Sequence, residues 1–400
     1  MDRILTTHVG SLLRPDSLTT ALKAREAHDE YDAEALDRDL ERAVTDVVAK
    51  QAEVGVDVVD DGEMGKTSWI TYIDYDRVTG ITPRKVPATD MTLPAGLDPE
   101  AHGGSAGLYT EFMPVDSDGE EHGEDERASG LLWVCDGPIE YVGGDVDKDI
   151  ANLTAALEGV DVVDSFIPCV APASVYWFRN EHYATEEEFV YALADALRIE
   201  YRRIHAAGIM VHVDDAVLWH MFGTIRLRGG TPEDYRRWAQ LRVDALNHAL
   251  EGIPADRVRY HICSGSDHAP HTQDPLLRDV IDMVLQVNAR YLLIEQGNAR
   301  HEHEWRIWED VTLPDDKVLV PGVVTHQTMM VEHPELVAQR LVRLAGLVGR
   351  ERVMAGTDCG FAQTASTKRV PQFTQWAKLQ AMVEGAQIAT KELWPAPVAA

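Results

Sequence analysis

The residue types with the greatest capacity for chemistry form a short motif, His261-Ile-Cys263, at the end of a β-branched run. On a strand, residues i and i+2 point to the same side, so the imidazole and the thiol can reach one ion. Zinc favours thiolate sulfur and imidazole nitrogen. Cys359, in a Gly-Thr-Asp-Cys-Gly turn, and Glu295, on an intervening strand, offer two further ligands. The sequence therefore predicts a Zn²⁺ site made of these four residues.

The four cysteines allow two interpretations, because a free cysteine usually packs as a small buried hydrophobe. They are scattered widely along the chain, which argues against a disulfide framework and favours a reducing cytoplasm. Cys135 and Cys169 lack ligand-type partners and are interpreted as buried thiols. His301 and His303 resemble metal ligands, but on a helix residues i and i+2 lie on different faces, so we interpret both as structural.

Reactive side chains also gather at the ends of other predicted strands. Barrels of alternating strands and helices build their sites at the carboxyl ends of the strands. Packing alone does not explain buried strands that finish repeatedly in a carboxylate, an imidazole or a thiol. The pair Asp214-Asp215 has a simpler alternative, which is to cap the following helix. Besides the predicted zinc ligands, the residues at these ends are His8, Ser11, Asp60, Asp61, Glu63, Asp214, Asp215 and Asp358.

Short β-branched runs alternate with long amphipathic stretches, which indicates a parallel α/β architecture. Eight such runs, each followed by a helical stretch, predict a (β/α)8 TIM barrel. The runs are Ile4–Val9, Val56–Asp60, Val163–Cys169, Ile209–Asp214, Val258–Cys263, Tyr291–Glu295, Val318–Val323 and Val353–Asp358.

Two of the helices carry clear boundary residues. Thr185 and Glu188 form a capping box that begins one helix, which Gly208 ends. Pro334 begins another, which ends at Gly349. The residues predicted to be buried on this second helix are Leu336, Val337, Leu341, Leu344 and Leu347.

One interval, residues 84–144, interrupts the rhythm with many prolines, glycines and acids. It contains an acidic run, DSDGEEHGEDE, typical of a solvated loop, and an apolar run, LLWVC. We expect an insertion near the barrel mouth, formed as a β-hairpin with an acidic loop, within a single barrel domain spanning residues 1–400.

Composition excludes several classes of partner. The net charge of -30 argues against nucleic acid and against anionic membrane surfaces. No apolar stretch is long enough to span a bilayer, and the first ten residues lack the apolar region of a signal peptide. We therefore expect a cytoplasmic protein whose partners are small molecules. The oligomeric state stays open, a homo-oligomer included.

A set of ordered motifs resembles cobalamin-independent methionine synthase. The resemblance is to the catalytic barrel of that family and, more closely, to its shorter stand-alone relatives, which include epoxyalkane:coenzyme M transferase. It spans nearly the whole chain apart from the insertion. The motifs are TTHVGSLLRP, VVDDGEMG, VHVDDAVL, HIC, LLIEQGNARHEHEW, VPGVV and AGTDCGF.

The resemblance implies roles for individual residues. The family's zinc ligands fall on His261, Cys263, Glu295 and Cys359, and its amino-acid thiol site falls on Ser11, Glu63 and Asp214. A tryptophan that lies beneath the pterin in the synthase corresponds loosely to Trp177. The catalytic histidine corresponds to His326, one residue out of register, so a structural role for His326 stays open.

The mechanism that these residues imply begins with a zinc-bound thiol, whose pKa the metal lowers so that the nucleophilic thiolate forms. Asp214 and Glu63 would pair with a substrate ammonium, and backbone N–H groups near Ser11 would bind its carboxylate. His326, or Asp215 through water, would then protonate the leaving group.

The leading hypothesis is transfer of a methyl group from a methyltetrahydrofolate-like or other donor to homocysteine or a related thiol. The alternative is the opening of an epoxide by coenzyme M. A third hypothesis is a metal-dependent hydrolase, which is disfavoured because the first strand has only His8 and not a His-x-His pair of ligands. A fourth is a non-enzymatic zinc- or thiol-binding protein.

Overall fold

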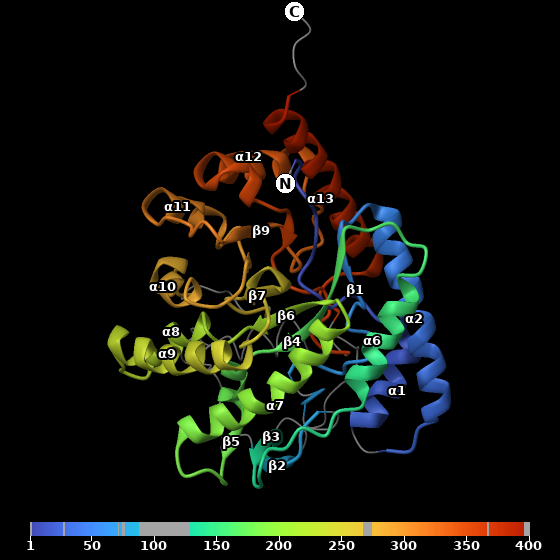
Figure 1. The fold of residues 1–400 in the computed structure, drawn as a ribbon, viewed down its shortest axis with the longest axis vertical. Coiled ribbons are helices and arrows are strands. Elements are labelled where there is room, and N and C mark those ends of the chain that lie inside the picture. Colours follow the sequence, from blue (N-terminus) through green and yellow to red (C-terminus); the bar gives the residue numbers. More distant parts are fainter. Residues whose placement is uncertain are drawn as a thin grey trace, which may run out of the picture.

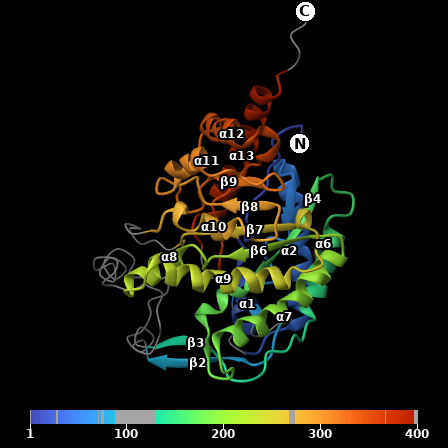
Figure 2. The same cartoon turned by 60° about the vertical axis from the view of Figure 1, so that its left-hand side comes forward.

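The chain folds into a ring of parallel strands enclosed by helices (Figure 1). Turned by 60°, the same molecule shows β6, β7, β8 and β9 following one another across the sheet, with helices on its outer side (Figure 2). The computed structural model describes residues 2–26, 29–70, 72–73, 77–87, 129–266, 274–365 and 368–395.

Seven strands form a parallel sheet in the order β1-β4-β6-β7-β8-β9-β10. Parallel bridges from Thr7 to Val58 on β1 and from Thr6 to Ala355 beside β10 close this sheet into a ring. The segment around Thr6 and Thr7 thus takes the place of an eighth strand, and the predicted (β/α)8 barrel is confirmed. The seven strands are β1 (Val58–Asp60), β4 (Asp164–Val170), β6 (Met210–Asp215), β7 (Val258–Ile262), β8 (Tyr291–Ile294), β9 (Val318–Val324) and β10 (Gly356–Thr357).

The helices pack around the outer face of this ring (Figure 1). Within the described residues, none of them has the combination of length and apolar composition needed to cross a membrane. The helices are α1 (Asp16–Glu26), α2 (Ala33–Val54), α6 (Asp145–Ala156), α7 (Glu186–Ala206), α8 (His220–Leu227), α9 (Pro232–Ala249), α10 (Ile281–Val284), α11 (Ile307–Asp310), α12 (Pro334–Val348) and α13 (Gln372–Leu393).

Local sequence rules explain where α7 and α12 begin. Thr185 and Glu188 form the predicted reciprocal capping box at α7. Pro334 occupies the first turn of α12, where its missing N–H costs no hydrogen bond. The prediction for the inner face of α12 was partly wrong, because Leu336 and Leu347 are exposed. Each precedes a buried valine by one residue and therefore lies about 100° further round the helix.

A small second sheet lies beside the barrel mouth. Strand β2 (Ile81–Pro87) pairs in antiparallel fashion with β3 (Ser129–Cys135), and β5 (Arg179–Asn180) adds to β3 in parallel. Because β5 follows β4 through a short 3-10 helix, η3 (Pro172–Trp177), this sheet is tied to the carboxyl end of the barrel. The inserted excursion near the mouth is thereby confirmed. The predicted acidic loop lies outside the described residues, and the boundaries 84–144 and the single-domain assignment stay predictions.

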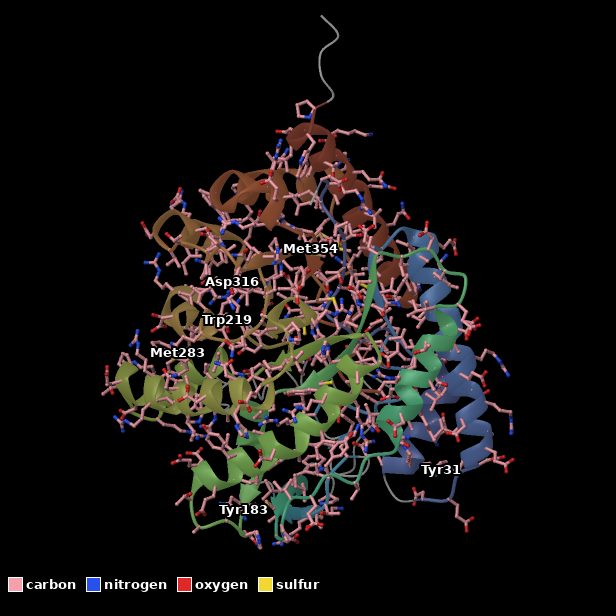
Figure 3. The ribbon with its side chains drawn as sticks, viewed as in Figure 1. Tyr31, Tyr183, Trp219, Met283, Asp316 and Met354 are labelled. Carbon is pink, nitrogen blue, oxygen red and sulfur yellow. The ribbon has the colours of Figure 1, made fainter. Side chains whose placement is uncertain are left out.

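The barrel interior combines an apolar cluster with a buried cation. Arg259 donates to His212 Nδ1 (3.1 Å), Thr7 Oγ1 (2.9 Å) and the His8 carbonyl (2.7 Å). The guanidinium lies 3.7 Å from the centre of the Phe166 ring, which belongs to the apolar cluster. The cluster consists of Val9, Val58, Phe166, Met210, Leu293, Val318, Val320 and Met354, the last labelled in Figure 3.

The close contact of α12 with α13 gives a stability prediction. A Cβ added at Gly385 on α13 would collide with the Val337 side chain and lie 2.8 Å from the Pro334 carbonyl oxygen. Gly385→Ala should therefore lower the free energy of unfolding by about 1–3 kcal/mol. Gly346 on α12 is exposed and has no atom within 4 Å of such a Cβ, so Gly346→Ala should raise it by about 0.5–1 kcal/mol. Urea midpoints measure both changes, and equal effects of the two substitutions would contradict this packing.

Candidate active site

Three ligand-type side chains meet at the carboxyl end of β7. The ligand atoms of His261, Cys263 and Cys359 all lie within 4.8 Å of one another, and all three residues are buried. Two of them reach the interior from alternate positions of one strand, as the pleat requires. Cys359 arrives from the turn after β10, on the far side of β8 and β9. The structure thus brings together three of the four predicted zinc ligands.

The ring of His261 leaves one nitrogen available to a metal. Its Nδ1 lies 3.3 Å from the Leu293 carbonyl oxygen, which can only accept, so Nδ1 carries the hydrogen. Nε2 is buried and has no hydrogen-bond partner among the described residues. Burial alone lowers the pKa of His261, but the Cys359 sulfur and Asp214 outweigh burial and raise it to about 9. The same negative surroundings favour a metal cation at Nε2.

The two sulfurs are surrounded by donors that suit thiolates. The Cys263 thiol donates a hydrogen bond to the Cys359 sulfur. This hydrogen bond lowers the pKa of Cys359 and raises that of Cys263. The Gly265 N–H lies 3.3 Å from Cys263 Sγ, and the Gln363 amide lies 3.8 Å from Cys359 Sγ. Two thiolates and a neutral imidazole are a donor set that zinc prefers. The residues present therefore fit Zn²⁺.

Glu295, the fourth predicted ligand, lies outside this group in the structure. Its Oε2 accepts hydrogen bonds from the Ser264 backbone N–H (3.0 Å) and hydroxyl (2.7 Å). Its Oε1 accepts one from Asn298 Nδ2 at 2.7 Å. Burial raises the pKa of Glu295, and the hydrogen bonds from Ser264 partly offset that rise. The carboxylate is thus occupied by protein donors on both oxygens.

Two further carboxyl groups lie beside the ligand group, and Glu63 Oε2 is 4.0 Å from Arg14 Nη2. Glu63 Oε2 and Asp214 Oδ1 are buried and have no hydrogen-bond partner within the described residues. Asp214 Oδ1 lies 3.9 Å from His261 Nε2. Burial raises the pKa of Asp214 to about 8 and also raises that of Glu63. Because burial disfavours the ionised form of both carboxyl groups, a cationic or hydrogen-bond-donating ligand beside these two oxygens would stabilise them.

Ser11 connects the loops that carry Glu63 and Cys359. Its carbonyl oxygen accepts a hydrogen bond from the Phe361 N–H at 2.8 Å. A side chain at Gly360 would collide with the Ser11 hydroxyl, so only glycine permits this close approach. The Ser11 backbone also hydrogen-bonds to Glu63. The sequence prediction assigned N–H groups near Ser11 to a substrate carboxylate, whereas the structure uses this one to orient Glu63.

The two candidate acids differ in their surroundings. His326 is buried beside Cys359, and its Nε2 lies 2.9 Å from the Ser266 hydroxyl. Burial lowers the pKa of His326 to about 4 and so disfavours its protonated form. Asp215 accepts hydrogen bonds from the Tyr260 hydroxyl (2.8 Å) and from backbone N–H groups of the following turn. These contacts favour the helix-capping interpretation of Asp215, whose catalytic role stays a prediction.

Three other residues from the sequence analysis lie elsewhere. Trp177 ends η3, but its side chain lies outside the described residues. Cys135 and Cys169 are buried, and their sulfurs contact the carbonyl oxygens of Gly137 and Ile167. Neither belongs to the ligand group, which agrees with their interpretation as buried thiols.

Sequence reasoning missed the position of His301. Its ring is buried 4.9 Å from the ring of Trp219, which is labelled in Figure 3. Burial lowers the pKa of His301, but Asp274 and Glu304 outweigh burial and raise it to about 10. Its Nε2 lies 2.7 Å from the Ser264 hydroxyl, the same hydroxyl that holds Glu295. The spacing of six residues between Glu295 and His301 was the available signal, because both lie after β8.

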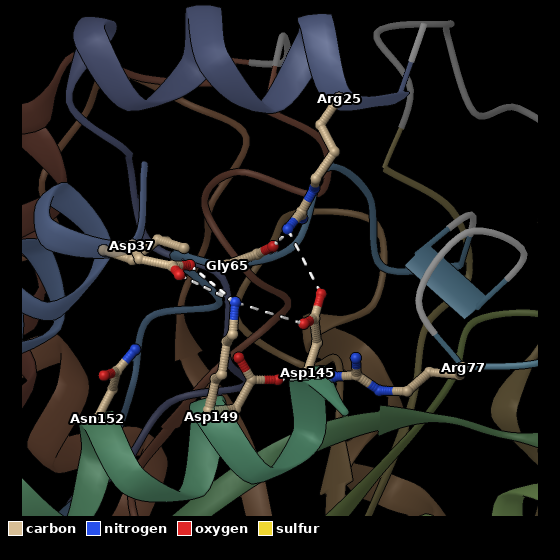
Figure 4. A pocket seen from close by; sticks show the side chains of 9 residues that line it. Arg25, Asp37, Gly65, Arg77, Asp145, Asp149 and Asn152 are labelled. Carbon is tan, nitrogen blue, oxygen red and sulfur yellow. Dashed lines mark hydrogen bonds and ion pairs between the residues drawn. The ribbon is translucent and has the colours of Figure 1, made fainter. Parts of the chain in front are cut away.

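A pocket on the outside of the barrel has a different character (Figure 4). It is lined by charges of both signs from α1, α2 and α6. Lys148 pairs with Asp37 at 2.9 Å and with Asp145 at 4.0 Å, and Arg25 lies 3.6 Å from Asp145. Because these charges neutralise one another, we interpret the pocket as part of a structural ionic network that joins α1, α2 and α6.

Comparison of the sequence with known proteins finds relatives among methionine synthases and a coenzyme M lyase. A methionine synthase of Sulfurisphaera tokodaii is 23% identical over 392 residues, covering 97% of this chain and 93% of that protein. The 2-hydroxypropyl-CoM lyase of Xanthobacter autotrophicus is 22% identical over 244 residues, covering 55% of this chain and 59% of that protein.

Solved structures agree in fold. A B12-independent methionine synthase from Shewanella sp. W3-18-1, in complex with selenomethionine, superposes with a TM-score of 0.71 at 18% identity, covering 98% of this chain and 99% of that one. The family model described as "Cobalamin-independent synthase, Catalytic domain" matches residues 172–387, which include His261, Cys263, Glu295 and Cys359. The chain therefore belongs to the cobalamin-independent synthase catalytic-domain family.

Proposed function

We propose that the chain is a zinc-dependent thiol S-methyltransferase. It would transfer a methyl group from a methyltetrahydrofolate-like or other donor to homocysteine or a related thiol, as a step of methionine biosynthesis. The reducing cytoplasm is the compartment that suits its four free cysteines. Family membership supports the reaction class, and the residues at the barrel mouth support the choice of acceptor.

The observation that carries this proposal is the meeting of two features at one place. The buried group of His261, Cys263 and Cys359 offers one nitrogen and two sulfurs to a metal. Beside it, Glu63 and Asp214 each present a buried carboxyl oxygen that accepts no hydrogen bond from the described residues. An amino-acid thiol carries a sulfur for the first feature and an ammonium for the second.

Bound Zn²⁺ would lower the pKa of the acceptor thiol and keep its sulfur nucleophilic near neutral pH. The protein residues do the remaining work. Cys263 and Cys359 supply negative charge that keeps the site rich in electrons. By resemblance to the family, we assign Glu295 as the fourth ligand, the one that would leave its metal position when the substrate sulfur arrives. Its hydrogen bonds from Ser264 and Asn298 are of the kind that carboxylate ligands of metals commonly accept.

Orientation of the acceptor follows from charge. An ammonium between Glu63 and Asp214 would stabilise their ionised forms, which burial otherwise disfavours. Ser11 and Arg14 hold Glu63 in place, the latter by donating to the Glu63 carbonyl at 2.8 Å. With the ammonium fixed at one end, the thiol at the other end is directed to the metal group. This geometry would convert a bimolecular encounter into an oriented one.

The leaving group of the donor needs a proton source. His326 faces Cys359 and retains one buried ring nitrogen, Nδ1, without a partner among the described residues. We assign His326 as the candidate proton carrier. It is neutral at rest because burial lowers its pKa to about 4, so it would first take up the proton that the acceptor thiol releases and then pass it to the leaving group. Trp177 is assigned to the donor side by resemblance alone.

The alternative function is epoxide opening by coenzyme M, which one partial relative supports by its name. Coenzyme M carries a sulfonate in place of the ammonium and carboxylate of an amino acid. A sulfonate beside Glu63 and Asp214 would be repelled whenever either carboxyl group is ionised. The acid pair therefore favours an amino-acid thiol.

The metal site gives the first test. We expect one zinc per chain with two sulfurs, one nitrogen and one oxygen in its shell, because three ligand atoms already converge and Glu295 is assigned as the fourth ligand. X-ray absorption and metal analysis measure the shell and the content. Cys263→Ala and Cys359→Ala should each lose most of the metal, whereas Cys135→Ala and Cys169→Ala should retain it. A shell without sulfur would contradict the proposal.

Asp214 separates the two functions. A charge-assisted hydrogen bond to a buried carboxylate is typically worth about 1.5–3 kcal/mol. Asp214→Asn should therefore weaken homocysteine binding by roughly ten- to a hundredfold. Coenzyme M has no ammonium, so its affinity should stay level or improve. Dissociation constants of both thiols, for wild type and variant, measure the effect.

Zinc content serves as the control in that experiment and should be equal in the two proteins. Unchanged homocysteine affinity in Asp214→Asn, or a wild-type preference for coenzyme M, would overturn the amino-acid assignment. Epoxide opening would then become the better-supported function.

A further inference from the structure

The loop that joins β9 to α12, residues 325–333, carries His326 and has no regular secondary structure. We propose that the buried ion pair of Glu332 and Lys378 holds this loop in place and thereby positions His326 for proton transfer. This inference rests on the proposed function, because it assumes that His326 carries a proton during methyl transfer. Neither Glu332 nor Lys378 lies in a motif of the family resemblance.

Apolar burial contributes little to the outer part of this loop. Met329, Met330 and Val331 are exposed by 61%, 76% and 41%. A segment with few buried apolar contacts opens easily unless polar contacts fix it. The loop nevertheless begins with two buried residues, Thr325 and His326. The placement of His326 therefore depends on the polar contacts at the base of the loop.

Glu332 connects the two ends of the loop. Its Oε1 accepts a hydrogen bond from the Thr325 backbone N–H at 2.9 Å. Thr325 directly follows β9 and directly precedes His326. The hydrogen bond thus fixes the backbone beside the residue that carries the imidazole.

Lys378, on α13, holds the other oxygen of that carboxylate. Its Nζ donates to Glu332 Oε2 at 2.8 Å and also to the Met330 carbonyl oxygen. The side chains of Lys378 and Glu332 are only 0% and 9% exposed, so dissolved salt screens this pair very little. Because α13 packs against α12 (Figure 1), the ion pair ties the loop to the helices of the barrel wall.

A second set of contacts to His326 comes from the loop after β7. The Nε2 atom of His326 lies 2.9 Å from the Ser266 hydroxyl, and the neighbouring Gln327 amide donates to the Gly265 carbonyl oxygen at 3.3 Å. His326 is therefore placed by two anchors, one from the β7 loop and one from α13. Loss of the α13 anchor should displace the imidazole. It should leave the carboxyl groups assigned to the acceptor thiol in place, since those belong to the ends of β1 and β6.

Two substitutions in the full chain test the anchor. Lys378→Met removes the charge and keeps a long side chain, whereas Glu332→Ala removes the acceptor of the Thr325 N–H. Heteronuclear NMR of isotope-labelled histidine rings reports on His326, whose signals are identified by their absence in His326→Ala. These signals should shift or broaden in both anchor variants, because the imidazole loses its fixed position.

The rate of methyl transfer gives a second readout, with methyltetrahydrofolate and homocysteine as probes and with zinc supplied. Because a misplacement of about 1 Å can cost a hundredfold in rate, Lys378→Met should lower kcat roughly ten- to a hundredfold. The homocysteine dissociation constant and the zinc content should stay unchanged. The double variant Lys378→Met/His326→Ala should be no slower than His326→Ala, because Lys378 acts through His326.

Lys317 offers a matched control for the loss of a buried lysine. It is also buried, and its Nζ donates to the carbonyl oxygens of Val287 and Ala289 at 2.6 and 2.7 Å. It directly precedes β9, whereas His326 follows the other end of that strand. Lys317→Met should therefore lower the stability of the fold and leave both the His326 signals and kcat unchanged.

The outcomes separate the anchor from the proposed function. Unchanged His326 signals in both anchor variants, or equal changes in Lys317→Met, would overturn the anchor. Changed signals with an unchanged kcat would overturn the part of the inference that concerns proton transfer. Wild-type protein that does not methylate homocysteine would overturn the proposed function, and the NMR comparison would still decide whether Glu332 and Lys378 hold His326.

Discussion

The pleat of β7 within a closed barrel is the constraint on which the rest of the site depends. Closure by the segment around Thr6 and Thr7 encloses one side of every strand. Alternate residues of β7 must then enter this shared interior, and Arg259, His261 and Cys263 do so in succession. A shift of one residue would send these polar groups to the helix-covered face, where they would have no partners. Register and chemistry are therefore determined together.

Burial is the second organising effect, because it acts in opposite ways on neighbouring groups. It raises the pKa of Asp214 to about 8 and lowers that of His326 to about 4, so both tend toward neutrality. His261 departs from this trend because the Cys359 sulfur and Asp214 favour a positive charge at its ring. The negative groups around His261 thus make this point of the barrel mouth favourable for a cation. A metal ion and a substrate ammonium both satisfy that preference.

Much of the fold could be predicted because its rules are local. Most of the β-branched runs, the Thr185 capping box and the Pro334 helix start depend on residues close in sequence, and these reappear in the structure. The run Ile4–Val9 instead forms only the bridges at Thr6 and Thr7, and Val353–Asp358 keeps only the two strand residues of β10. Burial on α12 was predicted less well. Leu336 and Leu347 are as apolar as their buried neighbours, and only the position of α13 decides which face is covered.

For the site, the sequence by itself determined the residue types and the strand ends that carry them, including the histidine and the cysteine that share one side of β7. Only the tertiary structure decided which side chains meet. Cys359 joins that pair because barrel closure brings the turn after β10 to it, whereas Glu295, an equally good ligand by type, is held by Ser264. Hydrogen bonds between residues distant in sequence depend on packing in three dimensions, and no local pattern encodes them.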